Sequence, residues 1–458
     1  MGEIIWTTHH IPTVDLFSYT ARNHAWIPHE WLSQLTIYLA YRAGGYSGLM
    51  AWLCVLSAVL FIAGYFLCSI VSGNPKVALV GVLVIWMFAT IGLAIRPQMI
   101  GYLLLVIELL LLHVGRIHDA RWLWGLPPLF VLWVNCHGSF FIGIVIALIA
   151  YGLSFVGFQA GSLISTKWQP ARRRYLACSL VIAGLAFFVN PVGGNQIIYP
   201  LDTMFQQNIQ LTHVQEWLPL QITEPRAVIL LLLLFCIFLL VLVRRSELQL
   251  QELVLLALGV WLGLSHQRML FVFGILAAPI LSRMLADLWD NYDPQRDRPV
   301  LNAWFIGFSL LVAVLAFPSR RVLAMEVERD NPVKAVSFLK THQVSGRMLN
   351  DYVYGGYLIW AAPEYPVFID GRGDVFEWTG VLGEFGSWAM LQSDPHALLD
   401  KYRVDLCLLS HDAPMARVLP LLGWNAIYSD SFSVIFIRPR SEVTTPQTAN
   451  TRPREQSQ

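Results

Sequence analysis

Long apolar stretches fill the sequence between about residues 46 and 317, and they constrain the fold more than any other feature. They cover about 46–72, 77–95, 99–115, 140–160, 175–190, 226–243, 249–265, 269–286 and 300–317. Their lengths approach the roughly 20 residues of a membrane-crossing helix, and continuous apolarity favours helices over a barrel. Residues 122–135 are shorter, so we expect a half-helix or tilted segment there. The sequence predicts an α-helical polytopic membrane protein with about nine to ten membrane segments.

Composition limits the function as well as the fold. Only 13% of the 458 residues are charged, whereas soluble domains carry roughly 25%. The net charge of +1 gives no reason to expect a nucleic-acid partner. The six cysteines are scattered and lack metal-ligand spacing, so we interpret them as small core residues.

Changes in polarity divide the chain into four parts. Residues 1–45 are expected to form an external loop and then an amphipathic interfacial helix over about 30–42. Residues 46–317 form the transmembrane domain. Residues 318–440 predict a small α/β domain, with strands at 348–350, 367–369, 405–409 and 434–437 and helices at 332–341 and 396–402. The tail, 441–458, is expected to be disordered.

Lysine and arginine in the short connections predict the orientation of the helices. One set of connections carries twelve basic residues, whereas the alternate set carries only Arg96, Arg226 and Arg268. Cytoplasmic loops carry the excess of Lys and Arg, so we place the second set, residues 1–45 and the α/β domain outside an inner (plasma) membrane. The rare polar motifs all fall on this outer face, which predicts a single site at one membrane interface.

Glu30 and Asp15 are the candidate catalytic residues. Glu30 lies in the segment 26–32, Trp-Ile-Pro-His-Glu-Trp-Leu, whose indoles are suited to pack on a sugar or a lipid head group. Sugar transfer from a phosphate to a hydroxyl needs a carboxylate that takes the proton of the acceptor. Alternatively, Glu30 only caps the following helix. His29 and Trp31 are predicted substrate-binding neighbours.

Arg96, Arg268 and Gln98 form the predicted phosphate-binding group. Arginines at a membrane boundary are usually anchors, but these two are among the few cations expected on the outer face. A lipid-phosphate donor needs such cations to hold the phosphate and stabilise the leaving group. Gln98 is the weaker member of the group.

Three further motifs supply candidate substrate-binding residues. Asn135 and His137 lie at a break between apolar segments, where a polar turn lines a cavity or caps a helix. Glu216 and Trp217 repeat the acid–indole pairing of residues 30–31, and an aromatic-belt anchor is the alternative. In the α/β domain, Asp370 and Arg372 lie in a loop at a predicted strand end, as site residues or as a salt-bridged turn.

Glu108 and His113 lie inside a predicted span, where ionisable groups are functional candidates. Glu108 alternatively is a neutral acid that forms a hydrogen bond between helices.

The order of these motifs resembles a group of bacterial polytopic membrane proteins placed near the GT-C glycosyltransferases, which include protein mannosyltransferase-like and lipid A aminoarabinose transferase-like enzymes. The matching stretches are His-Glu-Trp-Leu (29–32), Arg-Pro-Gln (96–98), Trp-x-Asn-x-His-Gly-Ser (133–139), Asn-Pro-x-Gly (190–193), Glu-Trp (216–217) and Ile-Asp-Gly-Arg (369–372). In related proteins a membrane helix ending in an Asp-x-Trp-Trp-His-like motif precedes the part that begins here. The resemblance therefore leads us to expect an N-terminal truncation, with a further carboxylate upstream.

The resemblance implies a membrane enzyme that transfers a sugar from a polyprenyl-phosphate donor to an extracytoplasmic glycan, lipid or protein acceptor. Asp15 or Glu30 then holds the essential acid of the first external loop, and Arg96 and Arg268 clamp the donor phosphate. No cofactor is required by the sequence, although a divalent metal ion is compatible with the carboxylates. The alternative is a non-catalytic or transport component of envelope glycan assembly: a lipid-linked glycan transporter, a ligase or a polymerase.

Overall fold

The computed structural model describes residues 1–90, 92–206, 217–288, 292, 293, 295 and 297–439, which form two compact units. The first unit comprises Met1–Leu16, Ala21–Val327 and Arg372–Gly380. The second comprises Phe17–Thr20, Glu328–Gly371 and the chain from Val381 onward. The two units are therefore not continuous in sequence, because each includes a short segment from the other's part of the chain. The predicted disordered tail, 441–458, lies outside the described residues.

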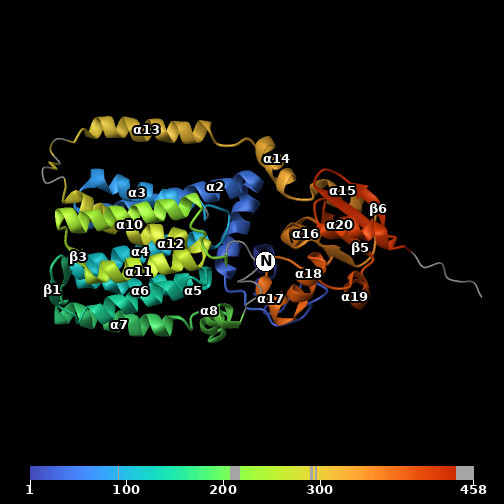
Figure 1. The fold of residues 1–458 in the computed structure, drawn as a ribbon, viewed down its shortest axis with the longest axis horizontal. Helices are drawn as coiled ribbons and strands as arrows, with labels where there is room; N and C mark the ends of the chain where they lie inside the picture. The colour runs from blue at the N-terminus through green and yellow to red at the C-terminus, as the bar shows by residue number, and fades with distance from the viewer. Residues whose placement is uncertain (91, 207–216, 289–291, 294, 296, 440–458) are drawn as a thin grey trace, which may run out of the picture. The chain divides into compact units, whose positions relative to one another are not determined.

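The first unit is a helical bundle (Figure 1). Its helices are α1 (Gly2–Thr8), α2 (Trp31–Ser72), α3 (Pro75–Ala89), α4 (Gln98–Ile117), η1 (Ala120–Gly125), α5 (Leu126–Cys136), α6 (Phe140–Leu153), α7 (Pro170–Ala186), α8 (Asn195–Gln206), α10 (Pro225–Arg244), α11 (Leu250–Ser265), η3 (Gln267–Met269), α12 (Leu270–Ala286), α13 (Pro299–Leu315), α14 (Arg320–Asp330) and α17 (Gly373–Trp378). The short strands β1 (Phe158–Ala160), β2 (Leu163–Ser165) and β3 (Leu248–Gln249) form a small sheet in that order. This sheet and α1 were not expected from the sequence.

Four of the described helices are long and apolar enough to cross a membrane: Trp31–Ser72, Gln98–Ile117, Pro225–Arg244 and Gln267–Ala286. The bent pair of α13 and α14 qualifies when taken together, and α3, α6 and α11 are shorter apolar helices. Large apolar side chains are exposed on the outside of the bundle, among them Phe66, Leu79, Trp86 and Phe235. Water would make this surface unfavourable, whereas lipid is its natural solvent. The prediction of an apolar helical membrane protein is confirmed.

Helix α12 lies at the centre of the bundle and packs against α2, α3 and α11. Fourteen of its residues are buried, from Leu270 to Met284. Small side chains such as Ala277 and Ala278 are fully buried and let neighbouring backbones approach, as is usual where helices associate in lipid. The core of the unit is therefore built around this helix.

Helix α2 combines two predicted elements in one helix. Gly45 interrupts it with a φ of +58° and a ψ of −139°, a conformation that glycine adopts without a steric penalty. The kink separates the predicted interfacial helix from the predicted span that begins near residue 46. The expected half-helix before residue 136 is also confirmed, as α5.

The second unit contains a four-stranded sheet with the order β4-β5-β7-β6. Its strands are β4 (Met348–Asn350), β5 (Leu406–Ser410), β6 (Asn425–Ser429) and β7 (Ser433–Ile437), and only the β4–β5 pair is parallel. The helices are α15 (Val333–Thr341), α16 (Gly355–Ala361), α18 (Val381–Ala389), α19 (Pro395–Lys401) and α20 (Pro414–Val418), with the 3-10 turns η5 (Tyr352–Tyr354) and η6 (Leu419–Leu422). The predicted α/β character is confirmed.

One predicted strand, 367–369, is wrong. Val367 forms only an isolated bridge with Ser18, and the backbone N–H of Phe368 donates to the side chain of Asn350 instead of to a ladder. The triplet is fully buried, which explains its strand-like apolarity. The strand that sequence analysis missed, β6, is a largely exposed edge strand with a bulge between Ala426 and Tyr428, so it lacks a clear alternating pattern.

Candidate functional site

Glu30 stands at the first residue before α2, but its side chain makes no capping hydrogen bond. Its carboxylate instead meets two imidazoles: Oε1 lies 3.3 Å from Nε2 of His137 and 3.6 Å from Nε2 of His29. The carboxyl group is partly buried, with 21% of the side chain exposed. We call Glu30, His29, His137 and Arg268 the Glu30 centre. The alternative that Glu30 merely caps its helix is therefore wrong.

His137 is oriented by the turn between α5 and α6. Its Nδ1 accepts from the backbone N–H of Ser139 at 3.1 Å and lies 2.8 Å from Ser139 Oγ. Trp133 Nε1 donates to the same hydroxyl oxygen at 3.0 Å, which leaves the hydroxyl proton for His137. Since Nδ1 is the acceptor, neutral His137 carries its proton on Nε2 and donates it to Glu30.

His29 is held from its other side. Nδ1 lies 3.2 Å from the carbonyl oxygen of Ile27, so this nitrogen donates, and the ring stacks on Tyr199 at 4.0 Å between centroids. The Gln196 side-chain amide donates to the backbone carbonyls of His29 and Val134. These contacts connect the start of α2 to α8 and to the end of α5.

The three ionisable groups at this centre have different protonation preferences. Burial disfavours ionisation of Glu30, but His29, then His137 and Arg268, outweigh it and lower the pKa of the carboxyl to about 2. Burial lowers the pKa of His137 to about 4, against the opposing effect of Glu30. Burial also acts against the charged form of His29, but Glu30 and Asp374 prevail and raise its pKa. At neutral pH the centre therefore holds a carboxylate and a neutral His137, while the raised pKa of His29 favours its cationic form.

Arg268, in the η3 turn before α12, supplies a guanidinium to this centre. Its Nη2 donates to Gln98 Oε1 at 2.8 Å, and its Cζ lies 4.4 Å from the centroid of the Trp217 ring. A guanidinium has five N–H donors, and no described residue forms a carboxylate salt bridge with this one. The structure thus joins Arg268, Gln98 and Trp217, while Arg96 is exposed just before α4.

Trp31 and Asn135 connect the start of α2 to α5 beside the centre, and their substrate-binding roles stay predictions. Trp31 Nε1 donates to Asn135 Oδ1 at 2.8 Å, and the Asn135 amide donates to the carbonyls of Val131 and Val189. On α4, Gly101 faces the His137 turn: a Cβ built there would lie 2.4 Å from Ser139 Oγ and 3.2 Å from His137 Nδ1. Close approach of α4 to the site therefore needs glycine at this position.

Asp15 forms a buried ion pair with Arg372, at 2.6 Å between Oδ1 and Nη1. The carboxylate is fully buried, and the guanidinium also lies 5.0 Å from the Trp26 ring centroid. Asp15 is thus placed as an ion-pair partner, and its predicted catalytic role remains untested. The segment that brings Arg372 also brings Asp374 into the first unit, close enough to influence His29.

Two predicted substrate-binding residues, Asp370 and Glu216, have not yet been placed. Asp370 is buried in the second unit, against Gly355. Glu216 lies outside the described residues. Four residues at or beside the centre, Ser139, Gln196, Tyr199 and Asp374, were not among the predicted site residues. Ser139 and Asp374 carried a local signal, because each stands two residues after a predicted site residue, His137 or Arg372, in a polar turn.

Glu108 lies fully buried within α4, next to Trp133 and Gly143. Neither of its carboxyl oxygens has a hydrogen-bond partner among the described residues, so the predicted bond between helices is not found there. His113 lines a pocket near the far end of the same helix.

A metal ion does not fit the described residues. No group of three His, Cys, Asp or Glu side chains in the described part of the chain is arranged to hold one. At the Glu30 centre, His137 presents an N–H to the carboxylate rather than a free lone pair, because its other ring nitrogen accepts from Ser139.

No protein-family model and no curated protein matches the sequence. Among solved structures, the chain is similar to the oligosaccharyltransferase of Archaeoglobus fulgidus tethered to an acceptor peptide with the NVT sequon, at 12% identity and a TM-score of 0.53. The match covers 89% of this chain and 64% of that protein, so the chain spans less than two thirds of its length. The same protein with an inhibitory peptide and a dolichol-phosphate matches at 12% identity, a TM-score of 0.49 and the same coverages.

At this identity the likeness establishes the fold alone. The first similarity covers 89% of the chain. This chain therefore has the fold of the GT-C glycosyltransferases.

Proposed function

We propose that the chain is a membrane glycosyltransferase that moves a sugar from a polyprenyl-phosphate donor to an extracytoplasmic acceptor at the Glu30 centre. The observation that carries the proposal is a partly buried, ionised carboxylate that lies within the electrostatic influence of Arg268, whose guanidinium forms no carboxylate salt bridge among the residues that the structure describes. Transfer from a phosphate needs both: an oxygen base for the acceptor's proton and a cation for the leaving phosphate.

In the proposed reaction, the acceptor hydroxyl attacks C1 of the sugar while the bond from C1 to the phosphate oxygen breaks. The acceptor proton passes to Glu30, and the electron pair of the broken bond stays on the phosphate, next to Arg268. A carboxyl with a pKa of about 2 is a weak base towards a free hydroxyl. It becomes competent once the new bond to C1 forms, because the attached hydroxyl is then strongly acidic.

Gln98 and Trp217 are positioning residues in this proposal. Gln98 accepts from one side of the guanidinium and Trp217 covers its face. Together they fix the plane of the guanidinium, so fewer rotamers are lost when a phosphate binds. Asp370 and Glu216 remain candidate substrate-binding residues from the sequence.

Binding of polyprenyl phosphate tests the proposal without knowledge of the sugar, since this lipid is the leaving group of every such donor. Arg268→Ala should weaken binding about 10–100-fold, because a charge-assisted contact to phosphate is lost. The matched control is Arg226→Ala, at the start of α10. Lipid binding can be measured by native mass spectrometry of the purified full chain. Equal affinities of wild type and Arg268→Ala would contradict the proposal.

Glu108 is the observation that favours a second function, transport of a lipid-linked glycan. Unpaired carboxyls inside the membrane mark substrate or ion pathways, and Glu108 has no hydrogen-bond partner among the described residues. Such a transporter would move lipid-linked sugars without releasing polyprenyl phosphate, so product release separates the two functions.

A further inference from the structure

A cavity in the first unit lies far from the Glu30 centre. It has a volume of about 600 Å³ and is lined by α2, α4, α11, α12 and the segment that leads into α7. On α4, Gln98 contacts the Glu30 centre through Arg268, whereas Arg116 lines this cavity near the other end of the same helix. Since a helix rises 1.5 Å per residue, the two places are roughly 27 Å apart along the axis.

The cavity has an apolar wall and a cationic rim. Leu109, Leu112, Leu255, Leu276 and Ile280 form part of the wall. The rim carries four basic side chains, Arg116, Lys167, Arg172 and Arg283, and one acid, Glu252. This division between apolar and charged surface suits an amphiphile better than a fully polar solute.

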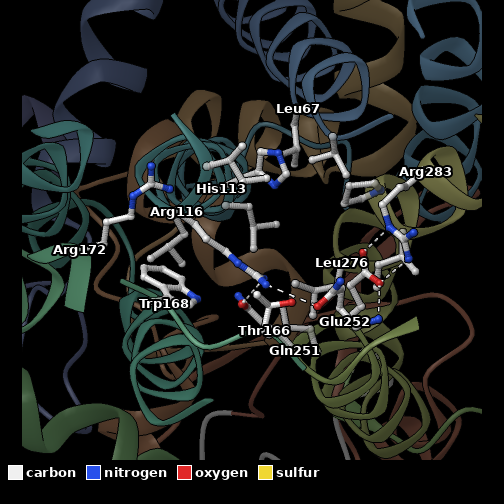
Figure 2. A pocket seen from close by; sticks show the side chains of 18 of the residues that line it. Leu67, His113, Arg116, Thr166, Trp168, Arg172, Gln251, Glu252, Leu276 and Arg283 are labelled. Atoms are coloured by element: carbon white, nitrogen blue, oxygen red, sulfur yellow. Dashed lines mark hydrogen bonds and ion pairs between the residues drawn. The ribbon is translucent and has the colours of Figure 1, made fainter. Parts of the chain in front are cut away.

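Among the described residues, Arg283 is the one of these four cations that forms a salt bridge with Glu252. Arg283 forms two hydrogen bonds with Glu252, at 2.7 Å and 2.6 Å, and a third with the carbonyl of Glu247. Arg116 donates instead to the amide oxygens of Gln251 and Gln249, which carry no charge. Figure 2 shows the Arg116 side chain reaching into the pocket, between Trp168 and Gln251.

Arg172 and Lys167 complete the cationic excess. The Arg172 guanidinium donates to the backbone carbonyl of His118, and Lys167 is exposed at the rim. Cations that are oriented by neutral groups keep their attraction for an anion. A phosphate group is the anion that best matches guanidinium and ammonium donors together.

Exposed indoles place the cavity at the depth of lipid head groups. Trp122 and Trp124, on η1 at this end of the bundle, expose 57% and 42% of their surface. Tryptophan gathers at the membrane–water interface, and basic residues gather on the side where anionic lipids are found. Both observations favour a lipid as the source of the phosphate.

We infer that this cavity binds the phosphate head group of an anionic membrane lipid, with Arg116, Lys167 and Arg172 around the phosphate and an acyl chain along the apolar wall. The site differs from the Glu30 centre in place and in chemistry, because it offers cations without a free carboxylate. Its occupancy does not depend on the proposed transfer reaction.

The test uses the purified full chain and native mass spectrometry, with phosphatidylglycerol as the anionic probe and phosphatidylcholine as the zwitterionic reference. We expect wild type to retain phosphatidylglycerol selectively. The variant Arg116→Gln/Lys167→Gln should bind it about thirtyfold more weakly, since each basic residue contributes to attraction for anionic lipid. The control with the same charge change, Arg174→Gln/Arg245→Gln, alters exposed residues outside the cavity and should stay within about twofold of wild type.

Two further variants and a competition experiment with inorganic phosphate distinguish this site from the alternatives. Lys167→Gln alone changes an exposed side chain and should weaken binding about fivefold, which guards against misfolding of the double variant. Arg268→Ala should leave phosphatidylglycerol binding unchanged, which separates this site from the donor site. Equal binding of the two lipids, or full binding by the double variant, would overturn the inference. Displacement of the lipid by equimolar inorganic phosphate would also overturn it and assign the cavity to a soluble phosphate.

Discussion

The charged side chains at the two ends of the helical unit have different kinds of partner. At the Glu30 centre, Glu30, His137 and Arg268 all have protein partners, and His137 is itself held by Ser139. At the other end, Arg116 and Arg172 are bonded to neutral groups around a cavity of about 600 Å³. The first arrangement is preorganised for chemistry, and the second is suited to hold a ligand. Substitutions should therefore disturb the first end more than the second.

The buried ion pairs of the two ends should show the largest contrast. Arg372→Ala leaves Asp15, which is fully buried, without its cation and should cost about 3–5 kcal/mol of unfolding free energy. Arg283→Ala at the cavity breaks a more exposed pair and should cost about 1.5–3 kcal/mol. Thermal unfolding in one detergent measures both. Equal losses of stability in the two variants would contradict this expectation. Partial recovery of stability in Asp15→Asn/Arg372→Gln would show that the loss comes from burying the Asp15 carboxylate without the Arg372 guanidinium.

The pH dependence of the free energy of unfolding should show that His137 is neutral in the folded protein. Its pKa is lowered from 6.5 to about 4 in the folded state, so the unfolded chain binds the extra proton first as pH falls. Stability should decrease from pH 6.5 to pH 4, by on the order of 3 kcal/mol from this group. His137→Gln should lose that part of the slope, whereas His118→Gln at the opposite end should keep it. Unfolding measured across this pH range compares the three proteins, and parallel curves would refute the assignment.

Two glycine substitutions, one beside the Glu30 centre and one away from it, should give the smallest of the three differences in stability. Gly101→Ala would push a methyl group against Ser139 and His137, and overpacking of this kind costs about 1–3 kcal/mol. Gly152→Ala, near the C-terminal end of α6, meets nothing within 4 Å and should be neutral or stabilising by up to about 1 kcal/mol. Unfolding temperatures of the two variants provide the comparison. A Gly101→Ala protein as stable as wild type would show that α4 can move away from the site.

Sequence analysis predicted most of the fold because apolar runs report helices directly. The break before His137 and the boundary near Gly45 were visible as polar or small residues within apolar surroundings. The β6 strand was missed because exposed edge strands have little pattern, and 367–369 was misassigned because burial alone imitates a strand.

The candidate site was harder to predict than the fold. Sequence analysis expected the polar motifs to converge, and the structure brings Glu30, His29, His137, Gln98, Arg268 and Trp217 to one end of the bundle. It did not reveal that Glu30 contacts His137, nor that Arg372 pairs with Asp15. Both pairings join residues more than a hundred positions apart, and charge or spacing carries no information about such partners.

The measurement closest to the central claim is the release of polyprenyl phosphate from a panel of polyprenyl-phosphate sugars by the full chain in proteoliposomes. Wild type should release it from at least one donor when an acceptor is present. Glu30→Gln should slow release by roughly 10²–10⁴-fold, the usual contribution of a general base, and Glu3→Gln on the exposed side of α1 should match wild type. Release by Glu30→Gln at the wild-type rate would contradict the account.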